Sequence, residues 1–487
     1  MTTATTAGAG TYALASWLFL RALGLIYFAA FASLARQILG LVGSGGILPA
    51  VEVLAAHQHW GLARFWRWPT LCWLRCSDRA LLFLSWGGAF LSLLLIAGIA
   101  PVLVLALLWM FYLSLFTVCR LFLCYQWDIL LLEAGFLALF LAPAELAPRF
   151  PPATAPSSLS VWLLWWLLFR LMFWSGVVKL RSGDAAWRSL MALKYHYETQ
   201  PLPTRVAWHA QQLPVSFHRF SVVIVLAIEL IGPFLIPAPP PWRHAVGGLF
   251  VFLMVLIQLT GNYAFFNLLG IALSLLLFDD AALAPVFQSA LPREELSFPF
   301  VPHLATVVSA GAATLVLLLS LDSIARLTRR SVHWPTLLAR FFDMIEPCHI
   351  VNSYGLFAVM TSWRPEIIVE GSHDGREWRA YEFKWKPGDL RRPPRFVAPH
   401  QPRLDWQMWF SALGFKGAEP WFDRFRARLL QGSPAVLALL RTNPFPGAPP
   451  RYVRGVLYDY RFTNRSERRL TGEWWSRERA RQKVGEG

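Results

Sequence analysis

Charged residues are scarce in this chain: Asp, Glu, Lys and Arg together make up 15% of its 487 residues. Soluble domains usually carry about 25%. The deficit lies in residues 1–322, which hold 17 basic and 13 acidic residues, whereas residues 323–487 hold 28 and 16. The net charge of +16 therefore divides into about +4 and +12. The composition indicates two regions of different character.

A basic segment ahead of the first apolar run is missing, because residues 1–16 contain no Lys or Arg. The sequence therefore predicts no cleavable signal peptide, which would need such a segment. Cysteine is also sparse, and only Cys348 lies in the second region, so that region cannot hold an internal disulfide. Cys72 and Cys76 stand four residues apart without a second His or Cys pair, which is too little for a metal site. We expect neither a metal nor a cofactor.

Sequence signatures of common enzymes are absent as well. The chain contains no HExxH, GxSxG, P-loop or GxGxxG motif, which argues against a known metalloprotease, hydrolase, NTPase or dinucleotide enzyme. The spacings typical of RRM, helix-turn-helix and zinc-finger domains are also missing. Arginines of the second region are interleaved with acids, so contact with an anionic membrane surface is favoured over nucleic acid. We expect membrane lipid as a partner and no nucleic acid.

Long apolar runs dominate the first region, and each is close to the ~20 residues that span a bilayer as a helix. They cover residues 17–39, 80–98, 101–119, 121–142, 159–180, 217–237, 244–262, 263–281 and 303–322. The sequence predicts an all-α polytopic membrane bundle of about seven to nine transmembrane helices over residues 1–322. Two long loops, 40–79 and 181–216, are predicted to lie at the membrane interface, the first because it contains the basic and aromatic sequence RFWRW.

The second region combines strand-like and helix-like segments. Residues 366–389 predict a β-hairpin around a His-Asp-Gly turn. Three helices and a strand are predicted after it, at 402–413, 421–432, 434–445 and 452–463. A small α+β domain that contains strands and is exposed to water is therefore predicted over residues 323–475. Residues 476–487 are predicted to be a charged, disordered tail.

Charged residues at membrane depth cost at least about 2.5–3.5 kcal/mol each, so they face protein or water. Asp128 and Glu133 lie in one apolar run, and Arg170 and Lys179 lie in the next. Two acids on one helix and two bases on its neighbour predict ion pairs between the helices, with Glu133 and Arg170 as the favoured pair. Such a pair could hold the helices together or line a functional cavity. Glu229 is a third acid in an apolar run.

A polar and aromatic run, LKYHYETQPLP at 193–203, follows the most Trp-rich apolar segment. On an extended segment His196 and Glu198 would share one face and could do acid–base work, or bind a metal with a third ligand from elsewhere. Lys179, at the end of a span, could act as a base if burial favoured its neutral form. These three are the candidate catalytic residues. The competing interpretation is a structural polar network under the membrane surface and a lysine that reaches toward the headgroups.

Charge also bears on orientation. Residues 40–79 hold four arginines, whereas residues 1–16 hold none. The positive-inside rule therefore places loop 40–79 in the cytoplasm. Large translocated domains do not obey this rule, so the charge of the second region does not determine its side.

Seven runs of this sequence resemble the lipase maturation factor family. They are LRALGLIYFAAF (20–31), YQWDILLLEAGFLALFLAP (125–143), LKYHYETQPLP (193–203), HIVNSYGLFAV (349–359), YEFKWKPGD (381–389), RLDWQMWF (403–410) and YVRGVLYDYRFT (452–463). The resemblance extends from the first apolar run almost to the C-terminus. The family-motif residues of its third run are Tyr195, His196, Tyr197, Glu198, Thr199, Gln200 and Pro201.

The resemblance implies a non-catalytic, multi-pass membrane protein that helps lipases to reach an active state, with a lipase as its client. It implies the endoplasmic reticulum membrane in a eukaryote and the cytoplasmic membrane in a bacterium. It also places the C-terminal domain on the lumenal or periplasmic side, where it helps to engage clients. The candidate client contacts are Trp406, Trp409 and Phe410 on the predicted helix 402–413, and core packing is the competing interpretation of each.

Two other functions stay open. The run SGVVKLRSGDAAW is similar to the lysine-bearing stretch in the membrane region of the vitamin K-dependent carboxylase. That likeness implies a membrane enzyme that uses Lys179 and His196 for proton transfer. The other alternative is a transporter, with Asp128, Glu133 and Arg170 lining its path.

Overall fold

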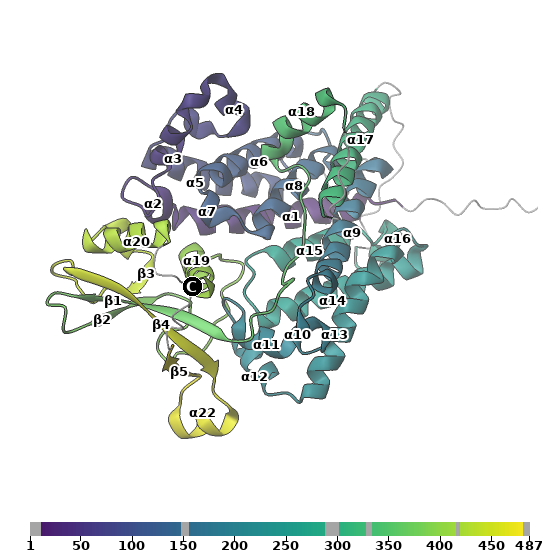
Figure 1. Ribbon diagram of the computed structural model, residues 1–487. Coiled ribbons are helices and arrows are strands. Elements are labelled where there is room, and N and C mark those ends of the chain that lie inside the picture. Colours follow the sequence, from purple (N-terminus) through teal and green to yellow (C-terminus); the bar gives the residue numbers. More distant parts are fainter. Residues whose placement is uncertain (1–10, 148–154, 288–300, 328–333, 415–418, 481–487) are drawn as a thin grey trace, which may run out of the picture.

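The computed structural model describes residues 11–147, 155–287, 301–327, 334–414 and 419–480. A bundle of helices forms one part of the molecule, and a sheet with short helices lies against one end of it (Figure 1). The main bundle helices are α1 (Ala13–Ala35), α5 (Asp78–Ala97), α6 (Pro101–Val118), α8 (Gln126–Leu141), α9 (Ser158–Arg181), α13 (Val215–Leu230), α14 (Pro240–Thr260), α15 (Phe266–Leu275) and α17 (Val301–Leu327).

These helices confirm a helical membrane bundle. Among the described residues, six helices are long and apolar enough to cross a membrane, and the bent pair of α12 (Arg205–Gln211) and α13, which meet at 116°, adds a seventh if it counts as one span. The structure thus reaches the lower end of the predicted range of seven to nine only when this bent pair is counted as one span. The runs around α8, with 16 residues, and α15, with 10, form helices shorter than a full span, although both pack within the bundle.

Local sequence explains where such helices begin and end. In α5, the Ser77 side chain accepts a hydrogen bond from the Ala80 backbone N–H, which is a common N-terminal cap. The helix stops at Gly98, whose φ of 82° is easy for glycine and strained for other residues. The apolar run 80–98 therefore folds as one helix with defined ends.

Both long loops contain short helices. The predicted loop 40–79 begins inside α2 (Ile38–Val42) and holds α3 (Ala50–Ala56), η1 (Gln58–Ala63), α4 (Arg64–Arg67) and η2 (Leu71–Trp73). Loop 181–216 holds α10 (Ala185–Arg188), α11 (Ala192–Thr199) and α12. The remaining short helices are α7 (Arg120–Leu123), η3 (Gly232–Leu235), α16 (Asp280–Leu283), α18 (Thr336–Ile345) and η4 (Glu346–Cys348). His196 and Glu198 therefore lie on a helix and not on an extended segment.

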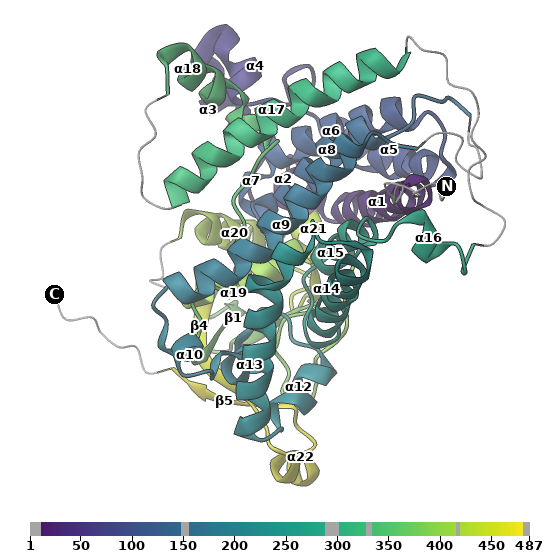
Figure 2. The same ribbon diagram turned by 90° about the vertical axis from the view of Figure 1, so that its right-hand side faces the viewer.

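The bundle helices alternate in direction, so their loops gather at two ends. At one end α16 lies beside the start of α1 (Figure 2). The Asp280 carboxylate accepts hydrogen bonds there from the backbone N–H groups of Ala13 at 3.0 Å and Leu14 at 2.9 Å. The carboxylate thereby satisfies two of the N–H groups that open a helix without a partner.

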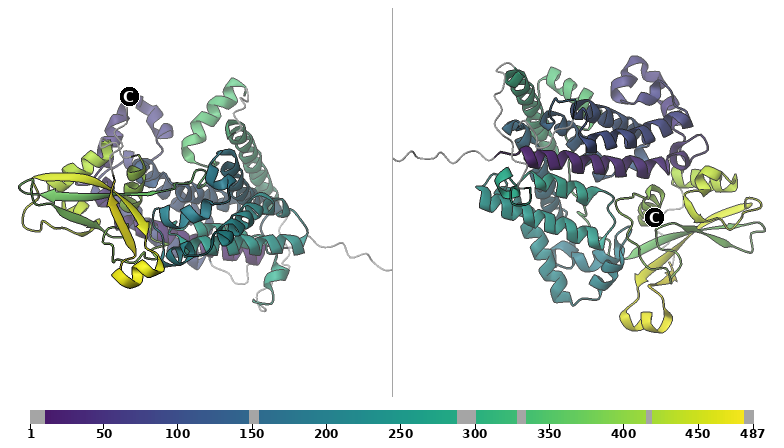
Figure 3. Two further views of the ribbon diagram at one scale, coloured as in Figure 1. Left: turned by 60° about the horizontal axis from the view of Figure 1, so that its bottom comes forward. Right: turned by 180° about the vertical axis from the view of Figure 1, so that it is seen from behind.

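The sheet lies at the opposite end, which we call the junction end (Figures 1 and 3). Loop 40–79 contacts the C-terminal region there, since Arg428 Nε donates to the Gly46 carbonyl at 2.8 Å. Loop 181–216 does the same, since Arg364 Nη1 donates to the Gln200 carbonyl at 2.5 Å. Both loops and the C-terminal region therefore share one end of the bundle.

Two expectations about the side of the membrane on which these segments lie conflict in this arrangement. The positive-inside rule places loop 40–79 in the cytoplasm, whereas the family resemblance places the C-terminal region on the lumenal or periplasmic side. Because the two segments touch at the junction end, they cannot lie on opposite sides of a membrane. One of the two expectations must be given up.

The C-terminal sheet is antiparallel, with the strand order β3-β2-β1-β4-β5. Its strands are β1 (Arg364–Ser372), β2 (Arg379–Phe383), β3 (Leu440–Thr442), β4 (Tyr452–Phe462) and β5 (Trp475–Arg479). The helices beside it are α19 (Arg403–Leu413), α20 (Pro420–Leu430), α21 (Pro434–Leu437) and α22 (Arg465–Thr471). The predicted hairpin is β1 and β2, the predicted strand is β4, and α19 and α20 match two predicted helices.

Two C-terminal segments differ from expectation. Within residues 434–445 only the short α21 is helical, and Leu440–Thr442 pair with β2 as an edge strand. Residues 476–479 belong to β5 and not to a disordered tail. Trp475 fixes this strand, because its ring stacks on Phe462 with the centroids 4.3 Å apart. Residues 481–487 lie outside the described part of the chain.

One hydrophobic core joins the bundle to the C-terminal region. Trp127 of α8 packs against Trp406 of α19 with ring centroids 4.8 Å apart. At another point α2 and α21 approach so closely that a Cβ atom added at Gly40 would lie 2.4 Å from the Ala435 carbonyl oxygen. The C-terminal region is thus packed onto the bundle and not merely tethered beside it.

Candidate functional site

The polar residues singled out in the sequence gather where the two regions meet. We call this contact the junction. Its bundle side is formed by α8, α11 and the break between α14 and α15, and its C-terminal side by residues 349–355, β1 and α19. Buried charges lie on both sides of it.

Asp128, in the first turn of α8, is fully buried and holds Arg403 of α19. Arg403 donates from Nη1 to Oδ2 at 2.6 Å and from Nη2 to Oδ1 at 2.8 Å, which is the two-point geometry in which a guanidinium best binds a carboxylate. The Tyr112 hydroxyl also donates to Oδ1 at 2.5 Å. The charge of Asp128 is therefore balanced by a residue 275 positions later in the chain and not by the neighbouring bundle helix.

Glu133 lies further along α8 and is also fully buried. Its Oε1 pairs with Arg170 of α9, so the structure brings together the two residues that the sequence favoured. Its Oε2 accepts from the Asn352 backbone N–H at 2.8 Å and from the Tyr354 hydroxyl at 2.6 Å. Arg170 in turn donates to the Asn352 carbonyl at 3.1 Å. Residues 349–355 thus close over the ion pair.

Arg364, at the start of β1, is buried against the C-terminal end of α11. Its guanidinium donates to the carbonyl oxygens of Glu198 at 2.7 Å, Gln200 at 2.5 Å and Pro201 at 2.8 Å. The last carbonyls of a helix lack partners within it, and Arg364 provides a donor for that of Glu198 in the last turn of α11 and for those of the two residues Gln200 and Pro201 that follow the helix. Glu366 balances the charge, because its Oε1 accepts from Arg364 Nη2 at 2.7 Å. The C-terminal region therefore recognises the backbone of the HYETQP run.

Two further hydrogen bonds bind α11 to the C-terminal region. Glu198 Oε2 accepts from the Phe462 backbone N–H at 2.8 Å, and Trp409 Nε1 donates to the Thr199 carbonyl at 2.9 Å. Burial raises the pKa of Glu198, although the Phe462 N–H and the charge of Arg364 act in the opposite direction. This carboxylate serves as an anchor for β4.

His196 faces the break between α14 and α15. The Tyr263 hydroxyl lies 3.0 Å from His196 Nε2 and donates to Gln200 Oε1 at 2.6 Å. A hydroxyl has one proton, so this pattern assigns a proton to Nε2 of His196. Burial and the nearby charge of Lys179 lower the pKa of His196 to about 4, and the ring is therefore neutral at pH 7. Of the two tyrosines on α11, Tyr197 is buried and Tyr195 is half-buried.

Lys179 lies near the C-terminal end of α9 and forms an ion pair with Glu229 of α13. Its Nζ lies 2.7 Å from each of the two carboxylate oxygens. A general base needs a free lone pair, which an ammonium held by a carboxylate does not offer. In the described residues no hydrogen bond joins Lys179, His196 and Glu198 to one another. The three candidate catalytic residues therefore do not form one site, and no cluster of His, Cys, Asp or Glu suited to a metal is found in the same residues.

The three candidate client contacts have different environments. Trp406 and Trp409 are only 3% and 8% exposed, whereas Phe410 is 43% exposed. Trp406 packs against Trp127 of α8, and the Trp409 indole N–H donates to the carbonyl at the end of α11. Of the three, only Phe410 presents much of its ring at the surface, where it stacks beside Tyr125 with ring centroids 5.9 Å apart.

Sequence reasoning missed the C-terminal half of the junction. Arg364, Arg403, Asn352 and Tyr354 were not among the candidate residues, because charge and spacing alone do not show which distant acid a residue meets. A usable signal existed for three of them: Arg403 opens the run RLDWQMWF, and Asn352 and Tyr354 lie in HIVNSYGLFAV. Both runs carry the family resemblance, and their polar residues turn out to be the partners of Asp128 and Glu133.

Asn262 is another residue whose distant hydrogen-bond partners only the structure shows. It lies in the break between α14 and α15. Its Nδ2 donates to the carbonyls of Leu202 at 3.0 Å and Arg395 at 2.8 Å, and its Oδ1 accepts from the Val397 backbone N–H at 2.6 Å. One amide side chain thus connects loop 181–216, the bundle and the C-terminal region.

Comparison with known proteins covers almost the whole chain. The family model described as the lipase maturation factor transmembrane domain matches residues 14–285, and the one described as the lipase maturation factor C-terminal domain matches residues 350–485. Lipase maturation factor 2 of Gallus gallus is 37% identical, over 95% of this chain and 79% of its own length.

Two further relatives give the same result. Lipase maturation factor 2 of Homo sapiens is 36% identical, over 95% of this chain and 81% of its own. Lipase maturation factor 1 of Bos taurus is 35% identical, over 97% and 88%. No solved structure matches significantly.

Proposed function

Because the chain belongs to the lipase maturation factor family, we propose that it assists the folding or assembly of lipases and has no catalytic activity of its own. The observation that carries this proposal is the match of both family models, in order, in one chain. The relatives named lipase maturation factor supply the client class. The comparisons give no support to a carboxylase or to a transporter.

The junction supports a structural use of its polar groups. Asp128, Glu133, Arg170 and Lys179 each contact an opposite charge within the chain. Separating the partners of such a buried pair would leave an uncompensated charge, so each pair opposes separation of the segments that carry it. None of these four residues is therefore available as a free base or as an unpaired charge for a transported substrate.

The proposed client surface lies on the C-terminal region around Phe410. The exposed ring of Phe410 is supported by Trp406 and Trp409, which are buried beneath it. An aromatic ring on a rigid support is a common anchor in protein–protein recognition. A lipase that has not completed folding would supply the matching apolar surface.

The chain is a multi-pass membrane protein, and we place it in the endoplasmic reticulum membrane of a eukaryotic host or the cytoplasmic membrane of a bacterial one. Secreted lipases fold on the lumenal or periplasmic side, so that is where we place the junction end. The positive-inside expectation for loop 40–79 is then the one to be given up.

Sidedness can be tested with epitope tags inserted singly after Gly61, at the kink inside η1, and after Gly183 and Gly447, which lie outside helices and strands. In sealed membrane vesicles the three tags should become accessible to antibody from the same, extracytoplasmic side. Accessibility from the cytoplasmic side would reverse the proposed orientation. A split among the three tags would contradict the shared junction end itself.

The function is tested by deleting the gene and measuring secreted lipase activity and lipase captured with the full-length protein. Wild type and the double variant Lys179→Met/Glu229→Met should both restore activity, because removing both members of a buried pair leaves no unpaired charge. An enzyme that uses Lys179 would lose all activity in that variant. Normal lipase maturation in the deletion strain would end the maturation proposal.

A further inference from the structure

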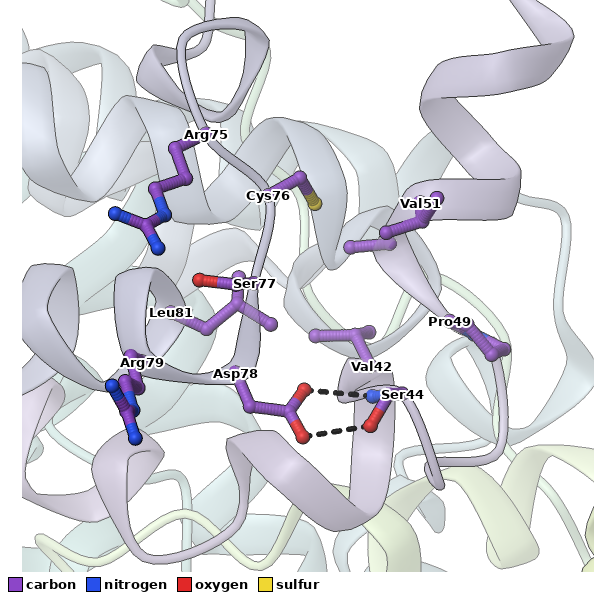
Figure 4. Close-up of a pocket in the computed structure, with 11 residues that line it drawn as sticks. Val42, Ser44, Pro49, Val51, Arg75, Cys76, Ser77, Asp78, Arg79 and Leu81 are labelled. Carbon is purple, nitrogen blue, oxygen red and sulfur yellow. Dashed lines mark hydrogen bonds between the residues drawn. The ribbon is translucent and has the colours of Figure 1, made fainter.

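A cavity of about 390 Å³ lies beside the start of α5, at the junction end (Figure 4). Three segments line it: the end of α2 with Val42 and Ser44, the start of α3 with Pro49 and Val51, and the first turn of α5 with the residues just before it. Since α5 is one of the membrane-spanning helices, the cavity lies where the chain passes from the polar to the apolar zone of the bilayer.

The available charge in this cavity is positive. The Asp78 carboxylate is already used, because it accepts from the Ser44 backbone N–H at 2.8 Å and from the Ser44 hydroxyl at 2.7 Å. Arg75 and Arg79 are exposed and have no hydrogen-bond or ion-pair partner in the described part of the chain. Figure 4 shows both arginine side chains leaving the chain on the same side. Two free guanidinium groups can hold a phosphate through charge-assisted hydrogen bonds.

An apolar stripe descends from this charge along α5. Phe83, Trp86, Phe90 and Leu93 are all exposed on the protein surface. They follow Arg79 at intervals of four, three, four and three residues, the spacing that places side chains on one face of a helix. Arg79 therefore stands at the polar end of a face that the protein itself does not cover.

The neighbouring loop has the composition of a headgroup-level segment. Leu62, Phe65, Trp66 and Leu74 are exposed, and Arg64 lies over the rings of Phe65 and Trp73. Exposed aromatic residues mixed with arginines are typical of the interface between membrane and water. The cavity thus opens among side chains suited to phospholipid headgroups.

We propose that this cavity binds the headgroup of an anionic phospholipid from the leaflet at the junction end. Arg75 and Arg79 bind the phosphodiester, Val42, Pro49 and Val51 contact the glycerol region, and one acyl chain lies along the α5 stripe. The volume suits a headgroup with its glycerol and excludes a whole lipid. A free phosphate would satisfy the arginines equally but would leave the stripe uncovered.

The test uses the full-length protein purified in detergent and its Arg75→Gln/Arg79→Gln variant. Each is titrated with phosphatidylglycerol, phosphatidylcholine and inorganic phosphate while the midpoint of thermal unfolding is followed, since a ligand that binds the folded state raises it. Phosphatidylglycerol should raise the wild-type midpoint, and the other two should not. In the variant its half-saturating concentration should rise roughly tenfold or more.

Two further variants make the result specific. Arg75→Lys/Arg79→Lys keeps the charge without the guanidinium fork and should lie between wild type and the Gln variant. Arg376→Gln/Arg379→Gln removes two exposed arginines beside the β1–β2 turn, far from the bundle, and should respond as wild type does. If the Gln variant does not fold, the Lys variant is judged by the amount of phosphatidylglycerol that co-purifies with it.

Three outcomes would overturn the proposal. An equal midpoint shift with inorganic phosphate would indicate a site for a free anion. An equal loss of affinity in the Arg376/Arg379 control would indicate general attraction to net positive charge. A wild type that does not respond to phosphatidylglycerol has no such site.

Discussion

The lipid-facing surface of the bundle and the junction use polar groups in opposite ways. On α5 the outward face between Phe83 and Leu93 carries exposed apolar side chains and no charge. At the junction Asp128, Glu133 and Arg403 are almost completely inaccessible to solvent. Each of these charges is paired with an opposite charge inside the protein. The difference teaches that the bundle is apolar toward lipid and polar toward its own C-terminal region, so its interior charges are attachment points.

A second contrast lies within the contact between the two regions. The Asp128–Arg403 pair is at its centre and is buried, whereas Glu52 of α3 and Arg424 of α20 form an ion pair at its rim with both side chains about half exposed. Pairs in water are weak because solvent screens them, and breaking a buried pair leaves a charge without compensation. The two pairs should therefore differ widely in their effect on stability.

The largest effect is expected from Arg403→Ala, which strands the Asp128 carboxylate inside the protein. The free energy of unfolding should fall by about 3–5 kcal/mol, and the C-terminal region should become sensitive to protease. Thermal unfolding in detergent measures the first effect and limited proteolysis the second. The double variant Asp128→Asn/Arg403→Met is the control and should recover much of the loss. A mild phenotype in Arg403→Ala would mean that the junction is not held by its charges.

A smaller loss, about 3 kcal/mol, is expected for Trp409→Ala, which opens a cavity and removes the hydrogen bond to Thr199. Its neighbour Phe410 is the matched comparison because its ring is partly exposed. Phe410→Ala should change stability little and reduce lipase capture. Equal effects of both variants on lipase capture, at equal protein amount, would argue against Phe410 as a client contact.

Acid should loosen the junction by a further, smaller amount. The pKa of His196 is lowered to about 4 by burial and by Lys179, and that of His400 to about 4 by burial and by the charge of Arg403. The ordinary value is about 6.5, so the unfolded chain binds more protons between these limits and stability falls as pH drops from about 6.5 toward 4. Thermal midpoints at pH 7 and pH 5 measure this loss.

The matched control for the acid effect is His400→Asn. His400 Nδ1 lies 2.8 Å from the Ser33 hydroxyl, and asparagine can keep a hydrogen bond there without titrating in this range. The variant should show a smaller drop in midpoint between pH 7 and pH 5 than wild type. An unchanged drop would assign the acid sensitivity to other groups.

The smallest effect is expected at the rim. Glu52→Ala or Arg424→Ala should change the free energy of unfolding by at most about 1 kcal/mol, and the change should shrink at high salt. Thermal unfolding in low and high salt provides the measurement. A loss as large as that of Arg403→Ala would remove the distinction between centre and rim.

Much of the fold could be predicted from the sequence because its signals are local. Apolar runs of spanning length define the bundle helices, and alternation with a turn defines β1, β2 and β4. The prediction of a helix over residues 434–445 was wrong for most of this segment. The leucine-rich run favours a helix locally, but pairing with β2 makes Leu440–Thr442 a strand. The prediction of a disordered tail was wrong for residues 476–479. Their charged sequence is typical of a tail, and only the structure shows that Trp475 fixes this segment on β4.

Only the bundle side of the candidate site could be predicted from the sequence. The charges of Asp128, Glu133, Arg170 and Lys179 stand out against apolar surroundings, so their burial and need for partners follow from the sequence. Arg403 lies in an ordinary polar context, and no local pattern joins it to an acid far upstream. Long-range partners of this kind depend on tertiary contact.

The distance in sequence between Asp128 and Arg403 has a consequence for synthesis. While the ribosome is still producing the C-terminal third, Glu133 of α8 can already meet Arg170, but Asp128 has no ion-pair partner until Arg403 is made. Until residue 403 has been synthesised, the Asp128 carboxylate must therefore be hydrated, be protonated or be bound by another factor. A premature stop before that residue would damage the membrane domain as well as the missing part, and the product would be expected to enter degradation as a whole.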